Sequence, residues 1–139
     1  MIKPSGVVFD TNVYSYAQRG DQTSIEVLRL ASTIVIPLIV QAELLAGYKG
    51  GNRFEQNVDV LNNFLELPRV QPLDPDTQTA FVYAELAAQL EGVGKKIPTN
   101  DIWIAALTMQ HGCKLFTFNA HFSKVEGLTF GKNAAELGL

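Results

Sequence analysis

The chain has 139 residues, of which 47% are hydrophobic and 18% charged. This length suits one domain, and the composition provides for a core and excludes a disordered chain. The net charge is −3, so bulk charge gives no indication of a nucleic-acid binder. A single cysteine excludes an internal disulfide framework, no apolar run approaches the ~20 residues of a membrane span, and residues 1–4 lack the apolar start of a signal peptide. We expect one cytoplasmic domain over residues 1–139 with no membrane contact.

The first half of the chain alternates between short apolar runs and helical patterns. Residues 6–9 predict a buried strand, and the β-branched residues 33–36 predict a second one. Pro37 ends the second run and suits the first turn of a helix. Helices are expected at about residues 13–19, 23–31, 38–46 and 54–65.

The second half repeats this alternation. Residues 69–71 predict a short strand, and Asp74 followed by Pro75 predicts a capped helix start. That helix carries an apolar stripe, made of Ala80, Phe81, Ala84, Ala87 and Ala88. A further helix is expected from about Pro98 to His111, then a third buried strand at 114–117 and an edge strand at 129–130.

The short, apolar and unalternating strands predict the fold class. Strands of this kind, separated by helices, are typical of a parallel sheet covered on both faces. We therefore expect an α/β fold, a three-layer α/β/α sandwich around a central, mainly parallel sheet. Functional sites in such folds lie at the carboxyl ends of the strands, which is where Asp10 and Asn119 fall.

Three carboxylates stand at positions that invite a functional interpretation. Glu43 interrupts a predicted apolar stripe of Ile39, Ala42 and Ala46, and an ionised carboxylate is costly to bury without a partner or a metal. Asp101 stands in the first turn of a predicted helix. The alternative for each is structural, because Glu43 can pair with a cation, and Asp10 and Asp101 can serve as turn or cap residues.

The combination of the three is more informative than any one of them. In a parallel three-layer fold Asp10, Glu43 and Asp101 can converge on one edge of the sheet. Three carboxylates in close proximity repel one another, and their pKa values rise unless a cation is present. Ligation by oxygen alone favours Mg²⁺ or Mn²⁺ over zinc. The pattern therefore predicts a divalent-cation site.

Four stretches in register resemble the PIN-domain family, in particular the VapC-type toxins of type II toxin–antitoxin pairs. The matching stretches are Val8 to Val13, Glu43 to Gly47, Pro98 to Ala106, and Leu115 to Phe122 followed by Val125 to Leu128. Each block is weak alone, but their order and spacing match the family over nearly the whole chain. The family fold is a parallel sheet between helices, in agreement with the fold expected above.

The resemblance implies a metal-dependent endoribonuclease, a hydrolase acting on RNA phosphodiester bonds. It makes Asp10, Glu43 and Asp101 the catalytic and metal-binding set, with Mg²⁺ as the cofactor and Mn²⁺ as the alternative. Asn119 stands where many members carry a fourth acid, so it is expected to ligate through its carbonyl or to hold a water. Side chains that orient the carboxylates are expected at Thr11, Asn12, Asn100 and Thr117, each with an alternative role as a cap or turn former.

The resemblance also implies binding partners, and it leaves alternative functions open. The resemblance implies a cognate antitoxin and a homodimer. The apolar residues that could line these partner surfaces, or could instead pack in the core, are Tyr14, Tyr16, Leu45, Tyr48, Phe54 and Phe64. Lys95, Lys96, Arg19 and Lys49 are candidates for contact with the RNA backbone. The alternatives are a PIN-fold RNA-processing nuclease without an antitoxin, and a weakly catalytic RNA- or protein-binding module. An aspartyl-phosphate enzyme is disfavoured because position 12 is Asn rather than Asp.

Overall fold

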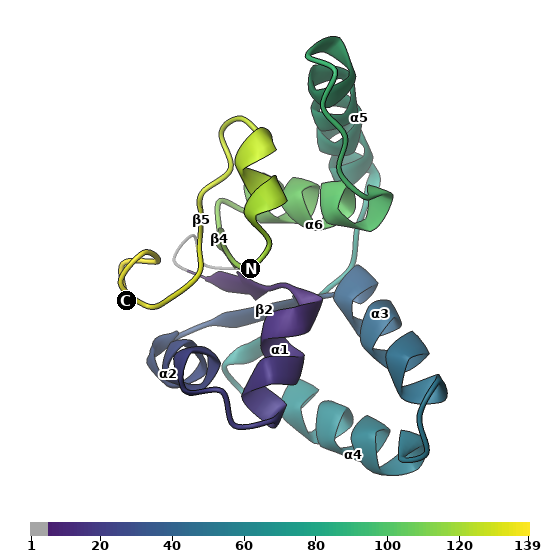
Figure 1. Ribbon diagram of the computed structural model, residues 1–139, viewed down its shortest axis with the longest axis vertical. Helices are drawn as coiled ribbons and strands as arrows, with labels where there is room; N and C mark the ends of the chain where they lie inside the picture. Colours follow the sequence, from purple (N-terminus) through teal and green to yellow (C-terminus); the bar gives the residue numbers. More distant parts are fainter. Residues whose placement is uncertain (1–5) are drawn as a thin grey trace.

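A five-stranded parallel sheet organises the computed structural model, which describes residues 6–139 (Figure 1). Its strands are β1 (Val7–Phe9), β2 (Ile34–Pro37), β3 (Val70–Leu73), β4 (Lys114–Phe116) and β5 (Phe130–Gly131). They lie in the order β3-β2-β1-β4-β5, and every neighbouring pair is parallel. Residues 1–4, considered above for a leader sequence, fall outside the described range.

Six α-helices in residues 6–139 cover the two faces of the sheet. They are α1 (Thr11–Gln18), α2 (Gln22–Leu30), α3 (Leu38–Lys49), α4 (Phe54–Leu65), α5 (Thr77–Gly92) and α6 (Thr99–Gln110), and a short 3-10 helix spans Ala120–Lys124. From β1 the chain adds β2 and then β3 on one side, and it then crosses back to add β4 and β5 on the other side of β1. Because crossovers between parallel strands are right-handed, this reversal places the early and late helices on opposite faces of the sheet. Figure 1 shows α1, α2 and α4 on one side of the sheet and α6 on the other. The predicted three-layer fold is confirmed. No helix in the described part of the chain is long and apolar enough to cross a membrane.

The core lies around the three central strands. All residues of β1 and β2 are buried, as are Leu115 and Phe116 of β4. The rings of Phe9 and Phe116 meet edge-on across the paired strands, with centroids 5.2 Å apart. Burial on both faces explains why these strands show continuous apolar runs instead of alternation.

The strand predicted at residues 69–71 lies further along the chain than expected, at Val70–Leu73, and includes Pro72. Proline lacks an amide hydrogen, which weighs against a strand interior. However, β3 is an edge strand that pairs with β2 only, and an edge strand tolerates proline where the missing donor faces solvent.

The predicted helix ends also needed correction. The cap of α5 is Asp76 and not Asp74, because the Asp76 carboxylate accepts from the Thr79 amide at 3.0 Å while the Thr79 hydroxyl accepts from the Asp76 amide at 2.9 Å. This reciprocal capping box satisfies two free donors instead of one. Helix α1 begins at Thr11, and α3 continues past Gly47 to Lys49.

Two apolar helix stripes found in the sequence face largely outward. On α5 the residues Ala80, Phe81, Ala84 and Ala88 are exposed, Phe81 to 66%, whereas Leu86 and Leu90 are buried. On α3 the predicted stripe is only partly covered, because Ile39 packs half-buried against the core while Ala42 and Ala46 are exposed, and the fully buried residues are Val40 and Leu44. Helical spacing reveals an apolar stripe, but neighbouring elements decide whether it is covered.

Tyr14 provides a test of core energetics. Its side chain is fully buried against Phe64, with ring centroids 5.1 Å apart, and its hydroxyl oxygen has no hydrogen-bond partner among residues 6–139. A buried, unsatisfied hydroxyl costs about 1–3 kcal/mol. We therefore expect Tyr14→Phe to raise the free energy of unfolding by about 1 kcal/mol in urea titrations. The matched control is Tyr16→Phe at a 44% exposed position, which should leave it unchanged. A loss of stability in Tyr14→Phe would contradict this account.

Candidate active site

The carboxyl ends of β1 and β4 meet at the point where the strand order reverses. The Asp10 amide, just past β1, donates to the Phe116 carbonyl at the end of β4 over 3.0 Å. Chain connections leave these two strands in opposite directions, to β2 on one side and to β5 on the other. Such a switch point leaves a crevice above the strand ends, which is where α/β proteins bind ligands.

Asp10 is held at the centre of this crevice. One oxygen of Asp10 caps α1 by accepting from the backbone amide of Thr11 at 2.9 Å. Its other oxygen accepts from the Thr117 hydroxyl at 2.8 Å and from the side-chain amide of Asn119 at 3.3 Å. Its side chain is buried, and this burial raises the pKa of Asp10 above the ordinary value of 3.8 despite the bonds from Thr117 and Thr11. The charge of Glu43 raises this pKa further.

Glu43 reaches the same crevice from α3. Its two oxygens accept from the Thr11 hydroxyl at 2.5 Å and from the Asn100 side chain at 3.4 Å. The Glu43 side chain is half-buried, and because Ala42 and Ala46 are exposed it does not interrupt a buried apolar stripe. Thr11 therefore bonds to both acids, with its amide on Asp10 and its hydroxyl on Glu43, and couples their positions.

Asp101 enters from the first turn of α6. One of its oxygens lies 2.6 Å from Nε2 of His121, which belongs to the 3-10 helix after β4. Burial raises the pKa of Asp101 most, the charge of Asp10 raises it further, and His121 opposes both. His121 has no role predicted from the sequence. Its position just beyond the carboxyl end of a predicted strand was the signal that could have identified it.

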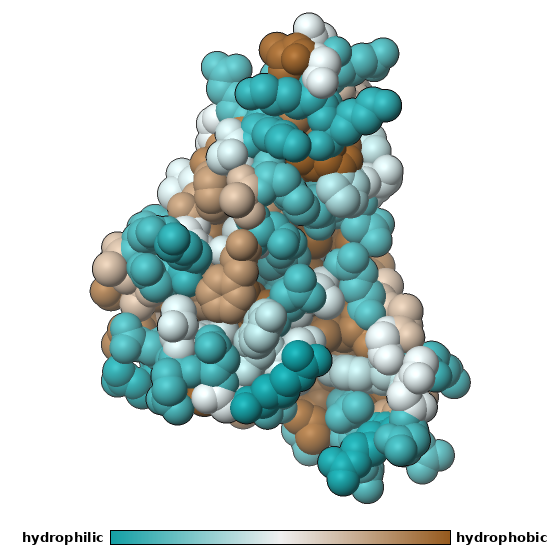
Figure 2. All heavy atoms as spheres, viewed as in Figure 1, coloured by the Kyte–Doolittle hydropathy of each residue, from teal (hydrophilic) through white to brown (hydrophobic). Residues whose placement is uncertain are grey.

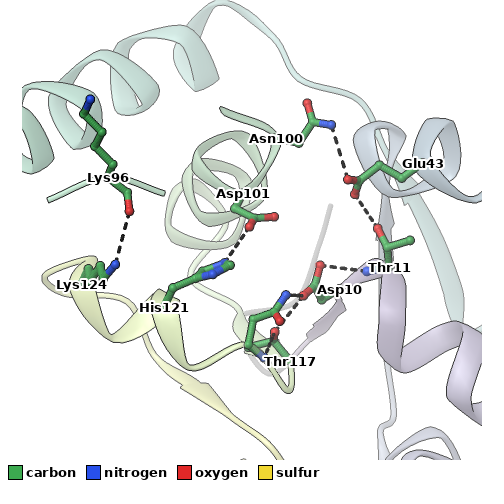
Figure 3. Close-up of polar contacts among 10 residues, drawn as sticks. Asp10, Thr11, Glu43, Lys96, Asn100, Asp101, Thr117, His121 and Lys124 are labelled. Atoms are coloured by element: carbon green, nitrogen blue, oxygen red, sulfur yellow. Dashed lines mark hydrogen bonds and ion pairs between the residues drawn. The ribbon is translucent and has the colours of Figure 1, made fainter. Parts of the chain in front are cut away.

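Figure 3 shows Asp10, Glu43 and Asp101 directed toward a shared space from three separate elements. We call these three residues the carboxylate cluster. Of the side chains expected to orient them, Thr11, Thr117 and Asn100 make the contacts described above. Asn119 also lies at the cluster and donates to Asp10. Asn12 is the exception, because its exposed side chain bonds to none of the acids.

Among residues 6–139, no lysine or arginine forms a salt bridge with the carboxylate cluster. His121 with Asp101 is the sole salt bridge within residues 6–139. In the same residues no three acidic, imidazole or thiol groups are arranged as a ready cage for a metal ion. Mg²⁺ needs no such cage, since proteins commonly bind it through one or two carboxylates and leave several waters in place. Raised carboxyl pKa values and oxygen-only donors therefore fit a hydrated Mg²⁺ ion.

A cleft opens beside the cluster, between α1, α3 and α4. Its volume is about 650 Å³, and the pair of Thr11 and Glu43 forms part of its wall. Arg19 and Arg53 line the cleft with several amide side chains. Figure 2 shows mainly hydrophilic side chains over this part of the surface. The cleft therefore continues the crevice along α1.

Comparisons with known proteins agree with this geometry. The family model described as PIN domain matches residues 7–128. Over 126 residues the chain is 33% identical to Ribonuclease VapC2 of Rickettsia felis, spanning 87% of this chain and 92% of that protein. It is 29% identical to Ribonuclease VapC1 of Haemophilus influenzae over the same shares.

Solved structures give the same result. The chain resembles one in the crystal structure of VapBC2 from Rickettsia felis bound to a DNA fragment from their promoter, with a TM-score of 0.82 and 31% identity. That match covers 91% of this chain and 97% of the other. It also resembles a chain of VapBC-1 from nontypeable Haemophilus influenzae, with a TM-score of 0.79, 27% identity, and 91% and 96% covered.

Proposed function

The chain belongs to the PIN-domain family, and from this membership and its carboxylate cluster we propose that it is a VapC-type, Mg²⁺-dependent endoribonuclease. The observation that carries the proposal is that Asp10, Glu43 and Asp101 come together from three elements at the switch point. The names of the relatives, ribonucleases of the VapC type, support RNA as the substrate.

Asp10 and Asp101 would hold the cation directly, and Glu43 would complete the site directly or through a water. When bound, Mg²⁺ lowers the pKa of a water and counters the charge that develops on the phosphate during hydrolysis. Mn²⁺ has the same preference for oxygen ligands and is expected to substitute.

The remaining polar residues hold the acids in position. Thr117 and the Thr11 amide orient Asp10, while the Thr11 hydroxyl and Asn100 orient Glu43. Asn119 turns its amide nitrogen toward Asp10, which favours a role in orienting that carboxylate over direct ligation. Fixed ligands of this kind lower the cost of assembling the site around a cation.

Digestion of total RNA by the purified protein, with and without Mg²⁺, tests this function. We expect discrete cleavage only with the cation, and mapping of the new ends identifies the cut sequence. RNA that stays intact in Mg²⁺ and in Mn²⁺ would favour the alternative of a weakly catalytic binding module.

An antitoxin partner and a homodimer are part of the proposal, for a protein acting in the cytoplasm. Solved relatives are VapBC complexes. Tyr16, Leu45 and Phe81 are exposed apolar side chains that could meet such partners, whereas Tyr14 and Phe64 are buried in the core and cannot. Growth arrest on expression, relieved by the product of a neighbouring small reading frame, would distinguish a toxin from an RNA-processing nuclease.

Cation binding should also stabilise the fold, and more so as pH rises. The pKa values of Asp10 and Asp101 are raised in the folded protein, so their contribution to stability is complete below the ordinary value of 3.8 and is lost as pH rises through the raised values. Above those values the ionised acids repel one another and are free to bind a cation. At neutral pH we expect Mn²⁺ at about a hundred times its Kd to raise Tm by roughly 5–10 °C. An equal rise at acid pH, or in Asp10→Asn, would contradict this prediction.

His121 should act as a positioning residue for Asp101. We expect His121→Ala to reduce Mg²⁺-dependent cleavage and Mn²⁺ affinity together, by about 10–100-fold, because an oriented metal ligand loses its partner. His121→Asn retains a hydrogen-bond donor and should recover part of both. Titration of the metal-free protein with Mn²⁺ provides the readout that is independent of catalysis. Unchanged Mn²⁺ affinity in His121→Ala would contradict the assignment.

A further inference from the structure

The cleft between α1, α3 and α4 carries two arginines that form no ion pair within residues 6–139, although the Arg19 guanidinium also lies over the Tyr16 ring, 5.8 Å from its centroid. Arg19 ends α1 and Arg53 precedes α4, and both are exposed. Within residues 6–139 neither guanidinium has a carboxylate partner or a side-chain hydrogen bond. The other two arginines lie outside the cleft: Arg69 donates to backbone carbonyls, and Arg29 is exposed on α2. Half of the arginines of an acidic chain therefore line one cleft.

The remaining lining suits an unpaired nucleic-acid strand. Amide side chains of Asn12, Asn52 and Asn57 line the cleft and offer both donors and acceptors, which single-stranded bases require on their exposed edges. The half-buried ring of Tyr48 adds an aromatic surface of the kind on which bases stack.

The acidic and basic groups of the cleft are attached to different parts of its helices. Glu43 bonds to Thr11 at the start of α1, whereas Arg19 follows the end of α1 and Arg53 lies between the end of α3 and the start of α4. The planar guanidinium presents paired donors that match phosphate oxygens. An RNA strand with its scissile phosphate at the cluster can thus place neighbouring phosphates against the arginines.

We infer that the cleft binds the RNA strand flanking the scissile phosphodiester, with Arg19 and Arg53 as its phosphate contacts. The inference rests on the proposed function for the identity of the strand. It adds a substrate-binding site that does not depend on the cation, because the two guanidinium groups carry their own charge.

Gly47 makes the inference testable without disturbing the fold. It lines the cleft from within α3, and a Cβ atom built on it meets no atom within 4 Å. A Cβ atom at position 47 therefore fits without a clash, and replacing glycine inside a helix favours folding. Gly47→Glu and Gly47→Lys are helix-compatible variants of similar length that differ in the sign of their charge.

The experiment measures the binding of a short fluorescein-labelled single-stranded RNA by fluorescence anisotropy in EDTA, over a range of salt concentrations. We expect the double variant Arg19→Ala/Arg53→Ala to bind about tenfold or more weakly, and the slope of log affinity against log salt to fall by roughly 1.4 for two lost phosphate contacts. Arg29→Ala is the matched control and should bind like wild type. Gly47→Glu should weaken binding and Gly47→Lys should not.

Three results would overturn the inference: no binding by wild type, unchanged affinity in the double variant, or equal loss in both Gly47 variants. Equal loss would mean that the bulk of the side chain at position 47, and not its charge, controls RNA binding. Mg²⁺-dependent cleavage by wild type, and its loss in Asp10→Asn, are measured separately. The proposed function can therefore fail while arginine-dependent binding holds, or hold while that binding fails.

Discussion

Asp10→Asn should reduce Mg²⁺-dependent cleavage of RNA by at least about a hundredfold, because the loss of a group that merely orients a metal ligand already costs about 10–100-fold. Asparagine keeps the shape of aspartate, and its carbonyl can still accept from the Thr11 amide, while its NH2 group replaces the oxygen that accepted from Thr117 and can donate to that hydroxyl oxygen instead. The substitution removes the charge from the cluster and leaves the cap of α1 in place. Initial rates on a labelled RNA, measured over a series of Mg²⁺ concentrations, give the result.

The stability of this variant separates chemistry from folding. Burial raises the pKa of Asp10, which means that the fold disfavours the ionised form at neutral pH. Metal-free Asp10→Asn should therefore unfold at the same urea concentration as wild type, or at a higher one. Asp74→Asn, the same change at an exposed position before α5, should leave both rate and stability unaltered. Full activity of a clean Asp10→Asn preparation would refute the assignment of Asp10.

Phe116→Ala should lower the free energy of unfolding by about 3–5 kcal/mol, the range typical of aromatic side chains deleted from a core. Phe116 is fully buried at the end of β4, where its ring meets Phe9 at 5.2 Å and Phe118 at 5.5 Å. Deleting the ring leaves a cavity beside Phe9 and Phe118, in the strand pair whose ends are joined by the bond from the Asp10 amide to the Phe116 carbonyl. Urea denaturation followed by circular dichroism measures the loss.

Phe81→Ala provides the comparison for this core deletion. It removes the same ring from the outer face of α5, where Phe81 is 66% exposed. Surface substitutions of this type change stability by about 0.5 kcal/mol or less. Similar losses in the two variants would mean that the packing around Phe116 is not the one described.

The predicted divalent-cation site depends on strand order as much as on acidic residues. Asp10 and Thr117 are 107 positions apart in sequence, and they bond because β1 and β4 pair in parallel with Phe9 opposite Phe116. Thr11 and Glu43 are 32 positions apart and meet because α1 and α3 pack together. A change that shifts the β1–β4 register by one residue would separate Asp10 from Thr117 even with every side chain retained.

The sequence by itself determined the alternation of elements, the parallel sheet and the strand end at which Asp10 lies. These follow from local chemistry, because fully buried strands must be apolar throughout and the helix beginning after Phe9 needs a polar cap. The similarity of the spaced motifs to the PIN-domain family came from the same residues.

Only the tertiary structure decided which side chains meet and which surfaces stay open. The contact between His121 and Asp101, the outward stripe of α5 and the cleft bearing Arg19 and Arg53 all depend on how whole elements pack. Helical periodicity identifies an apolar face of a single helix, whereas the burial of that face depends on which neighbouring elements pack against it. For that reason the sequence could name the three acids, with Thr11, Asn100 and Thr117 as candidate neighbours, whereas the contact of His121 and the cleft beside the cluster required the fold.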